Sequence, residues 1–152
     1  MADRESQVIA RIAPGVATLA AGQWDDLAGS DDPFLGHAFL TALEQSGSVG
    51  EGTGWTAAPI LVEGEGGIIT AAAPAYLKSH SQGEYVFDHG WADAFERAGG
   101  QYYPKLQIAV PFTPVPGRRL LGSSPQTLLA AVEAVVTQNG LSSAHATFIG
   151  ES

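Results

Sequence analysis

The sequence contains no cysteine, which excludes disulfide bonds, thiolate metal sites and cysteine nucleophiles. It also lacks any apolar run near the ~20 residues that a membrane-spanning helix needs. The first residues, MADRESQVIARIAPG, carry charges of both signs and have no apolar stretch of the kind found in a secretory signal. We therefore expect a cytoplasmic protein without a membrane span.

Basic residues are scarce as well. Seven Lys and Arg stand against sixteen Asp and Glu, which gives a formal net charge of −9. Because neutralising nucleic-acid phosphates requires clustered Lys and Arg, this balance argues against a DNA-binding protein. Ten of the acidic residues lie in the first 65 positions, whereas five of the seven basic residues lie at or after Lys78. Any anion site is therefore expected in the second half of the chain.

The length and residue patterns that are present predict one domain of mixed α/β class. A chain of 152 residues, 45% of them apolar, is long enough to bury a core. Segments 59–63 and 68–72 flank a glycine-rich turn and predict an antiparallel hairpin. Its second arm continues to Lys78, with Pro74 at a bulge or a sheet edge. Further elements are a helix at 32–47, a short strand at 83–88 and a helix at 91–98.

The second half of the chain predicts a β-α-β unit. Leu106, Ile108 and Val110 alternate with less apolar neighbours, as in a strand with one apolar face. A helix at 125–138 follows, with Ser124 as its cap, and residues 144–149 form the last strand. The two strands of this unit are expected to be parallel, and the crossover between them is expected to be right-handed.

Polar and aromatic residues concentrate between Tyr76 and Phe112, and this density is the first indication of a functional site. The residues that we expect to bind a substrate there are His80, Asp88, Tyr103 and Lys105. For aromatic residues that border a strand, a place in the core is the alternative.

Two other kinds of site find little support in this region. A metal site would combine His80, His89 and Asp88, but their spacing matches no known ligand pattern, so no metal is predicted. A Ser-His-Asp triad would need Ser79 or Ser81 beside these groups, and the Gly-x-Ser-x-Gly motif is missing. Catalytic residues are therefore left unassigned.

One basic cluster, Gly117-Arg118-Arg119, lies between the strand that begins at Lys105 and the helix at 125–138. Such a position suits a phosphate, because the start of a helix offers unpaired N–H groups to an anion. A solvated turn is the alternative.

Long blocks of the chain resemble a known family. They are PFLGHAFLTALEQSGSVGEGTGW, YLKSHSQGEYVFDHGWADAFERAGGQYYPKLQIAVPFTPVPGRRLL and the terminal LSSAHATFIGES. They are similar to bacterial GNAT-like proteins described as FemAB-like and associated with peptidoglycan biosynthesis or recognition. The resemblance implies a GNAT-like fold and acyl or aminoacyl transfer to an amino group. It also implies acetyl-CoA or aminoacyl-tRNA as the donor and a peptidoglycan precursor as the acceptor. Spacing alone is compatible with other α+β sandwiches.

In GNAT folds the acyl donor enters where two parallel strands separate, which corresponds here to residues 106–110 and 144–149. The resemblance thus implies a donor site at Gln107, Ala109 and Val110, with Gly117 and Arg118 near the donor phosphates.

Family members are more than twice as long as this chain. We therefore expect residues 1–152 to be one GNAT-like domain, the amino-terminal half of a two-domain protein, and to be inactive alone. A recognition module without catalysis is the alternative function. We also expect a homodimer, formed through the strand at 143–149 or the helix at 125–138, because an unpaired strand edge is a template for another chain.

Overall fold

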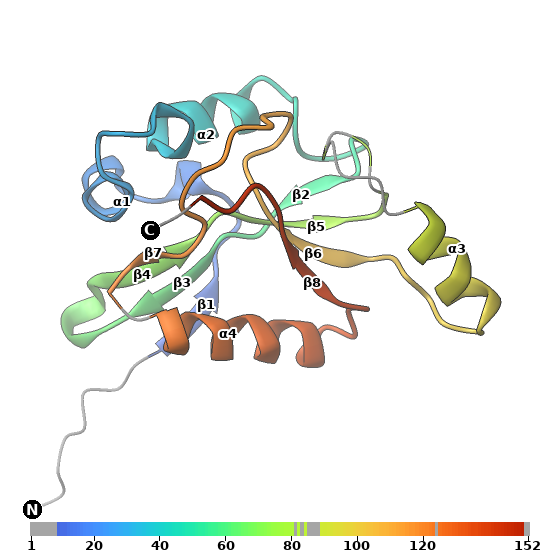
Figure 1. Cartoon of the computed structure of the whole chain (residues 1–152). Helices are drawn as coiled ribbons and strands as arrows, with labels where there is room; N and C mark the ends of the chain where they lie inside the picture. Colours follow the sequence, from blue (N-terminus) through green and yellow to red (C-terminus); the bar gives the residue numbers. More distant parts are fainter. Residues whose placement is uncertain (1–8, 81, 83, 85–88, 124, 151–152) are drawn as a thin grey trace, which may run out of the picture.

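The computed structural model describes residues 9–80, 82, 84, 89–123 and 125–150. These residues form four α-helices and two four-stranded sheets (Figure 1). The α-helices are α1 (Ala21–Ala28), α2 (His37–Gln45), α3 (His89–Arg97) and α4 (Pro125–Gln138), and 3-10 turns lie at Val16–Thr18, Pro33–Leu35 and Glu65–Gly67. The strands are β1 (Ile9–Ile12), β2 (Trp55–Ala57), β3 (Ile60–Glu63), β4 (Ile69–Ala73), β5 (Ala75–Lys78), β6 (Lys105–Ile108), β7 (Leu121–Gly122) and β8 (Ala144–Ala146).

The first sheet has the strand order β1-β3-β4-β7, and all of its pairs are antiparallel. The second sheet has the order β2-β5-β6-β8, in which β6 and β8 are the parallel pair. The predicted hairpin is confirmed as β3 and β4, and the predicted β-α-β unit is confirmed as β6, α4 and β8. The chain is therefore of mixed α/β class.

Pro74 marks the point where the chain passes from the first sheet to the second. It separates β4 from β5, and proline donates no ladder hydrogen bond. The pairing nevertheless continues across this junction, since the N–H of Ala58 donates to the carbonyl of Ala75 at 2.9 Å. The carbonyl of Pro74 accepts from the N–H of Ala109 at 3.0 Å. The predicted bulge or edge is thus a sheet switch within one long hairpin.

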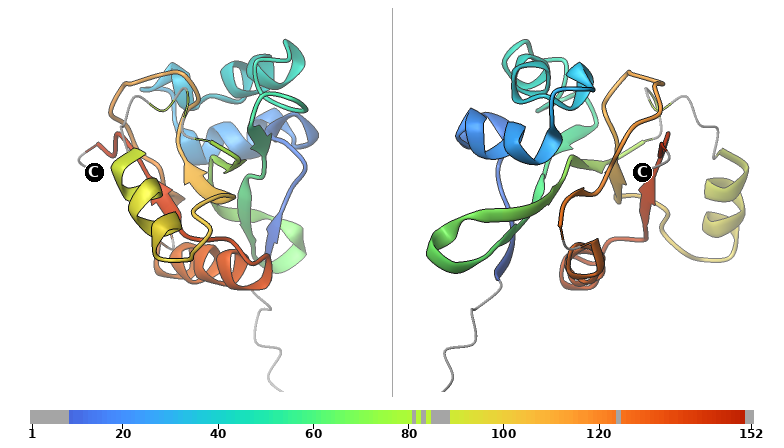
Figure 2. Two further views of the ribbon diagram at one scale, coloured as in Figure 1. Left: turned by 90° about the vertical axis from the view of Figure 1, so that its right-hand side faces the viewer. Right: turned by 60° about the vertical axis from the view of Figure 1, so that its left-hand side comes forward.

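Helices cover the first sheet on both faces (Figures 1 and 2). Alternate residues of β3 supply the two cores, because side chains of a strand point to opposite faces. Leu61 packs with Trp24 and Leu40 beneath α1 and α2. Ile60 and Val62 belong to a second core, shared with α4 and with the apolar face of β6. The helix α4 therefore ties the two sheets together.

Three predicted elements differ from the structure. The strand predicted at 105–110 ends at Ile108, because Val110 packs into the core beneath α1 and α2 rather than against α4. The last strand ends at Ala146, and Phe148 has a φ of 54°, which is incompatible with an extended strand. The helix predicted at 32–47 is interrupted near Gly36, although Asp32 does cap its start by accepting from Phe34 N at 3.0 Å.

The strand predicted at 83–88 lies outside the described residues except for Glu84, and so does the cap Ser124. None of the helices in the described part of the chain is long and apolar enough to cross a membrane.

Candidate functional site

One face of the second sheet is polar and yet buried. Leu77, Leu106 and Ile108 belong to the core shared with α4, so the residues between them point to the opposite face. We call this opposite surface the polar face; across the four strands it carries Trp55, Tyr76, Lys78, Lys105, Gln107 and His145. The four polar-face side chains on β5 and β6, those of Tyr76, Lys78, Lys105 and Gln107, are at most 1% exposed. Buried polar side chains in such a row are costly unless they are paired.

Two lysines of the polar face share one carboxylate. Lys105 Nζ lies 2.8 Å from Glu84 Oε1, and Lys78 Nζ lies 3.4 Å from Glu84 Oε2. The longer contact is an ion pair without hydrogen-bond geometry. Lys78 also donates to Gln82 O at 2.8 Å and stands 3.6 Å from the centre of the Trp55 ring. These contacts offset the cost of burying two cations.

Two other groups of the polar face have no hydrogen-bond partner in the described structure. They are the hydroxyl of Tyr76 and Oε1 of Gln107, which lie on neighbouring strands at paired positions. Burial raises the pKa of the Tyr76 phenol above its ordinary value, and the carboxylate of Glu44 raises it further. Gln107 uses its other end, where Nε2 donates to Thr147 Oγ1 at 3.0 Å. Buried polar atoms without partners are uncommon and often mark functional positions.

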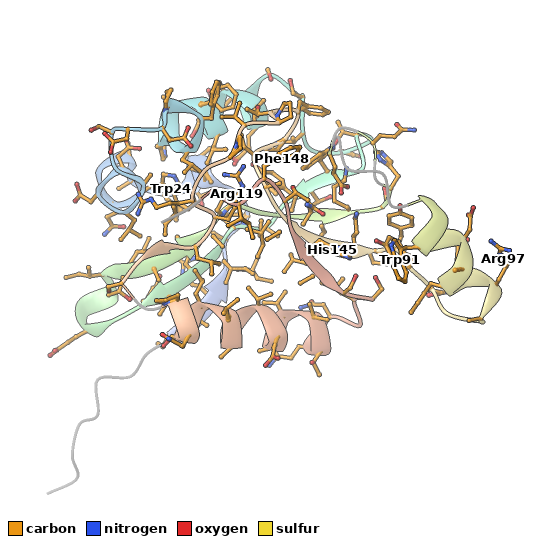
Figure 3. All side chains as sticks on the ribbon, in the orientation of Figure 1. Trp24, Trp91, Arg97, Arg119, His145 and Phe148 are labelled. Atoms are coloured by element: carbon orange, nitrogen blue, oxygen red, sulfur yellow. The ribbon has the colours of Figure 1, made fainter. Side chains whose placement is uncertain are left out.

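The edge strand β8 completes the polar face (Figure 3). His145 pairs with Gln107 in the register, and its Nε2 lies 2.7 Å from Ser143 Oγ and 3.5 Å from the hydroxyl of Tyr102. The sequence analysis did not single out His145. The sequence does contain a pattern that indicates this position: polar residues alternate with apolar ones, as on one face of a strand, at Ser143, His145 and Thr147.

The parallel strands separate after Ile108. Their last contact is the hydrogen bond from Thr147 N to Ile108 O, at 3.2 Å. Beyond it the chain after β8 pairs with Gly117 instead, through Gly117 N to Phe148 O at 3.0 Å and Gly150 N to Gly117 O at 2.7 Å. The sequence analysis expected a separation of these strands within residues 106–110 and 144–149.

Arg119 lies at this separation and is 2% exposed. Its guanidinium donates to three carbonyls: Thr147 O at 3.0 Å, Val115 O at 3.0 Å and Arg118 O at 3.1 Å. Burial lowers the pKa of Arg119, and the carboxylate of Asp32 opposes that shift. Arg119 thus fastens the 115–118 loop to the end of β8.

An open cleft of about 510 Å³ adjoins the separation. Asp31, Asp32 and Phe34 line one wall, and the segment 115–118 lines the other. Gly117 links the two features, because it borders the cleft and pairs with Ile149. The cleft therefore combines two carboxylates with an aromatic side chain next to the diverging strands.

The residues predicted for the donor site lie near the point where β6 and β8 separate, but most of them are buried or already bonded to other parts of the protein. Gln107, Ala109 and Val110 are buried, and Gly117 is paired with the chain after β8. Arg118 turns toward α1, where one of its terminal nitrogens donates to Leu27 O at 3.1 Å and to Ala28 O at 2.5 Å. Its charge therefore lies at the carboxyl end of a helix, where cations are favourable.

The residues predicted to bind the substrate are only partly brought together. Lys105 Nζ lies 5.8 Å from the ring centre of Tyr103. His80 lies apart, where its Nε2 contacts Thr53 O at 3.0 Å and its Nδ1 accepts from Gln82 N at 3.1 Å.

Asp88 and the side chain of His89 lie outside the described residues. Trp91 is 77% exposed on α3. Among the residues that the structure describes, no three His, Asp or Glu side chains gather as metal ligands would.

Comparison with known proteins identifies the family. The sequence profile of the FemAB-like family, described as peptidoglycan biosynthesis/recognition, matches residues 15–152. The match includes every described element except β1. Neither a curated protein nor a solved structure matches the chain. Since the profile covers nearly all of the sequence, the chain belongs to the FemAB-like family of peptidoglycan biosynthesis or recognition.

Proposed function

We propose that this protein takes part in N-acyl transfer to a peptidoglycan precursor. The observation that carries the proposal is the separation of the parallel strands β6 and β8 beside a cleft that Asp31, Asp32 and Arg118 help to line. Separated parallel strands expose backbone groups that otherwise bond to each other, and such groups are suited to hold an acyl carbonyl. Membership in the FemAB-like family supports a cell-wall precursor as the acceptor.

The donor side of the proposal rests on Val110. The last bond between β6 and the chain after β8 is the one from Thr147 N to Ile108 O, and the N–H of Ala109 donates to Pro74 O on the β5 side. Because backbone groups alternate along a strand, the N–H of Val110 is the first one directed toward the β8 side beyond this pairing. No hydrogen bond from this N–H is found within the described part of the chain. It is therefore the backbone donor that we assign to the carbonyl oxygen of the acyl group. Acetyl-CoA or aminoacyl-tRNA is the proposed donor, with its phosphates near Gly117 and Arg118.

The acceptor side rests on the cleft. An amino group is protonated in water, and the carboxylates of Asp31 and Asp32 favour its binding there. Once the ammonium group has given one proton to water, its nitrogen attacks the acyl carbonyl. The bond from the carbonyl carbon to the sulfur or oxygen of the donor breaks, a second proton of the amine leaves with the thiol or hydroxyl of the donor, and an amide forms. Holding the two reactants side by side supplies much of the acceleration. His80, Asp88, Tyr103 and Lys105 remain predicted substrate contacts.

A transfer assay tests the proposal. The protein is incubated with acetyl-CoA and a peptidoglycan stem peptide that contains lysine, and mass spectrometry detects a peptide with one added acetyl group. Val110→Pro removes the N–H and is expected to abolish product, whereas Val110→Ala keeps the N–H and is expected to retain it. Asp31→Asn is expected to raise the KM for the peptide, with the exposed Asp26→Asn as the matched control.

A second candidate function is recognition of a cell-wall precursor without transfer. It is favoured by the burial of Gln107, Ala109 and Val110, which leaves the donor positions covered by protein. Saturable binding of the stem peptide, sensitive to Asp31→Asn, together with no product from either proposed donor, would select this function over acyl transfer.

A further inference from the structure

The cleft beside the strand separation carries charges of both signs that do not pair with each other. Asp31 and Asp32 line one wall, and Arg118 lines the other. Within the described residues, Arg118 forms no ion pair with either carboxylate. Opposite charges that share a cleft without neutralising each other are complementary to a ligand that carries both charges.

Each wall holds one of its charged groups in place. Arg118 Nη2 donates to Leu27 O and to Ala28 O, which fixes the guanidinium at the carboxyl end of α1. On the opposite wall, Asp32 Oδ1 accepts from Phe34 N as the cap of the 3-10 turn at Pro33–Leu35. Because the protein itself positions both charges, a ligand loses less free energy in ordering them when it binds.

Part of the hydrogen-bonding capacity of these groups is unused. Among the described residues, Nη1 of Arg118 has no acceptor, Oδ2 of Asp32 has no donor, and Asp31 has no hydrogen-bond or ion-pair partner. Asp31 and Arg118 are exposed, so a ligand can reach them from solution. The N–H groups of Nη1 suit a carboxylate, with which they form short, charge-assisted hydrogen bonds, and the aspartates suit an ammonium group.

Two glycines show that the charged groups lie close to one another. A Cβ atom on Gly29 would lie 3.4 Å from Arg118 Nη2. Asp31 follows Gly29 by two residues, which is a backbone span of at most ~7 Å. On the other wall, a Cβ atom on Gly117 would collide with Asp32 Oδ2, so this carboxylate reaches the residue next to Arg118. The anionic and cationic groups therefore adjoin across the cleft.

The remaining residues that line the cleft are apolar or glycine. Phe34 is half-buried on the wall of the carboxylates, and Val115 and Pro116 lie on the facing wall. With a volume of about 510 Å³, the cleft has room for a side chain that ends in charged groups. Such a side chain would place its methylene groups against the apolar lining and its charged end between the two walls.

We propose that the cleft binds the end of a diamino diacid side chain, in which an amine and a carboxylate share one carbon. Asp31 and Asp32 hold the ammonium group, and Arg118 Nη1 holds the carboxylate. The inference rests on the proposed function, because it specifies the acceptor: a stem peptide with diaminopimelate is preferred to one with lysine, whose side chain ends in an amine alone. Arg118 is also expected near the donor phosphates, and the experiment separates these two anions.

Calorimetric titration of the full chain with three matched peptides tests the inference. Each is an N-acetylated, C-amidated L-alanyl-γ-D-glutamyl peptide that ends in lysine, in meso-diaminopimelate, or in meso-diaminopimelate with its side-chain carboxyl amidated. The diaminopimelate peptide is expected to bind roughly 5- to 10-fold more tightly than the other two, because it alone supplies a carboxylate to Arg118.

Variants assign the preference to the two charged groups. Arg118→Gln is expected to abolish the preference without weakening the lysine peptide, whereas Asp31→Asn is expected to weaken all three peptides. Arg97→Gln is the matched control, because Arg97 is an exposed arginine on α3 that also donates to a backbone carbonyl, that of Asp93. This control is expected to keep the preference.

Four results would overturn the inference: equal affinity for lysine and diaminopimelate peptides, no loss on amidation, a preference that survives Arg118→Gln, or no binding of any peptide to folded protein. If Arg118→Gln weakens the binding of CoA and leaves the preference intact, Arg118 serves the donor phosphates and the inference is wrong. If that variant fails to fold by circular dichroism, the amidated peptide on the wild-type chain decides. Equal transfer to both acceptors would support N-acyl transfer alone, whereas a binding preference without transfer would support this inference together with recognition.

Discussion

Single residues of the polar face show where the fold tolerates an energetic cost. Tyr76 and Gln107 each keep a buried polar atom without a partner in the described structure, and such an atom costs roughly 1–3 kcal/mol. Arg119 shows the opposite case, because its buried guanidinium reaches three carbonyls. The buried polar groups of the described chain therefore include both stabilising and destabilising ones.

Tyr76→Phe is expected to increase the free energy of unfolding at pH 7 by about 1 kcal/mol, since it removes a buried hydroxyl without a partner. Burial raises the pKa of Tyr76 in the folded protein above the value of roughly 10 in the unfolded chain. The neutral phenol is thus favoured by folding, and its contribution is complete below pH ~10 and declines at higher pH. Urea unfolding at pH 7 and pH 11 should show a smaller alkaline loss in the variant. An equal loss in both proteins would contradict the assignment.

Arg119→Leu is expected to lower the free energy of unfolding by about 2–4 kcal/mol, because it leaves three carbonyls without their charged donor. Arg118→Leu is the matched control, since its bonds to Leu27 O and Ala28 O lie at an exposed helix end. The control should lose about 1 kcal/mol or less. Urea titration of both variants makes the comparison, and similar losses would argue against the fastening role of Arg119.

At the scale of elements, the hairpin and the β-α-β unit could be predicted from the sequence, because the spacing of apolar residues that identifies a strand or a helix lies within each segment. The ends of β6 and β8 could not be predicted, because contacts with residues far away in the sequence determine where these strands end. Val110 joins the core beneath α1 and α2, and the chain after β8 pairs with Gly117. For the candidate site, the alternation of Lys105 and Gln107 was visible. Their burial was not, since Glu84 and the other groups beside them come from elsewhere in the chain.

Gly122→Ala tests the pairing of β4 with β7. Gly122 has a φ of 97°, and a Cβ atom there would lie 2.2 Å from Thr70 O. Gly140→Ala is the control, because its φ of 64° is also left-handed but its surroundings are open. In both variants the positive φ is expected to lower the free energy of unfolding by about 1–2 kcal/mol, because alanine disfavours this backbone conformation. Only Gly122→Ala is expected to lose more in thermal or urea unfolding, and an equal loss would show that the strand pair adjusts.

At the scale of the whole molecule, α4 bridges two sheets, and β8 lies at one edge in the described part of the chain. A homodimer through residues 143–149 or α4, and a second GNAT-like half, both stay predictions. Light scattering at micromolar concentration is expected to give twice the chain mass of 15.7 kDa. Leu129→Glu, at a side chain that is 51% exposed on α4, is expected to weaken such a dimer. A monomeric wild-type protein would contradict this prediction.

The central claim is that the separation of β6 and β8 receives an acyl donor. Proton–nitrogen NMR spectra recorded during titration with acetyl-CoA test it most directly, because they report on each backbone N–H. The account predicts saturable shifts at Val110 and Gly117 and along the chain after β8, with smaller changes at α3. An absence of shifts at Val110 and Gly117 at saturating acetyl-CoA, or shifts confined to another part of the molecule, would contradict the claim for acetyl-CoA as the donor.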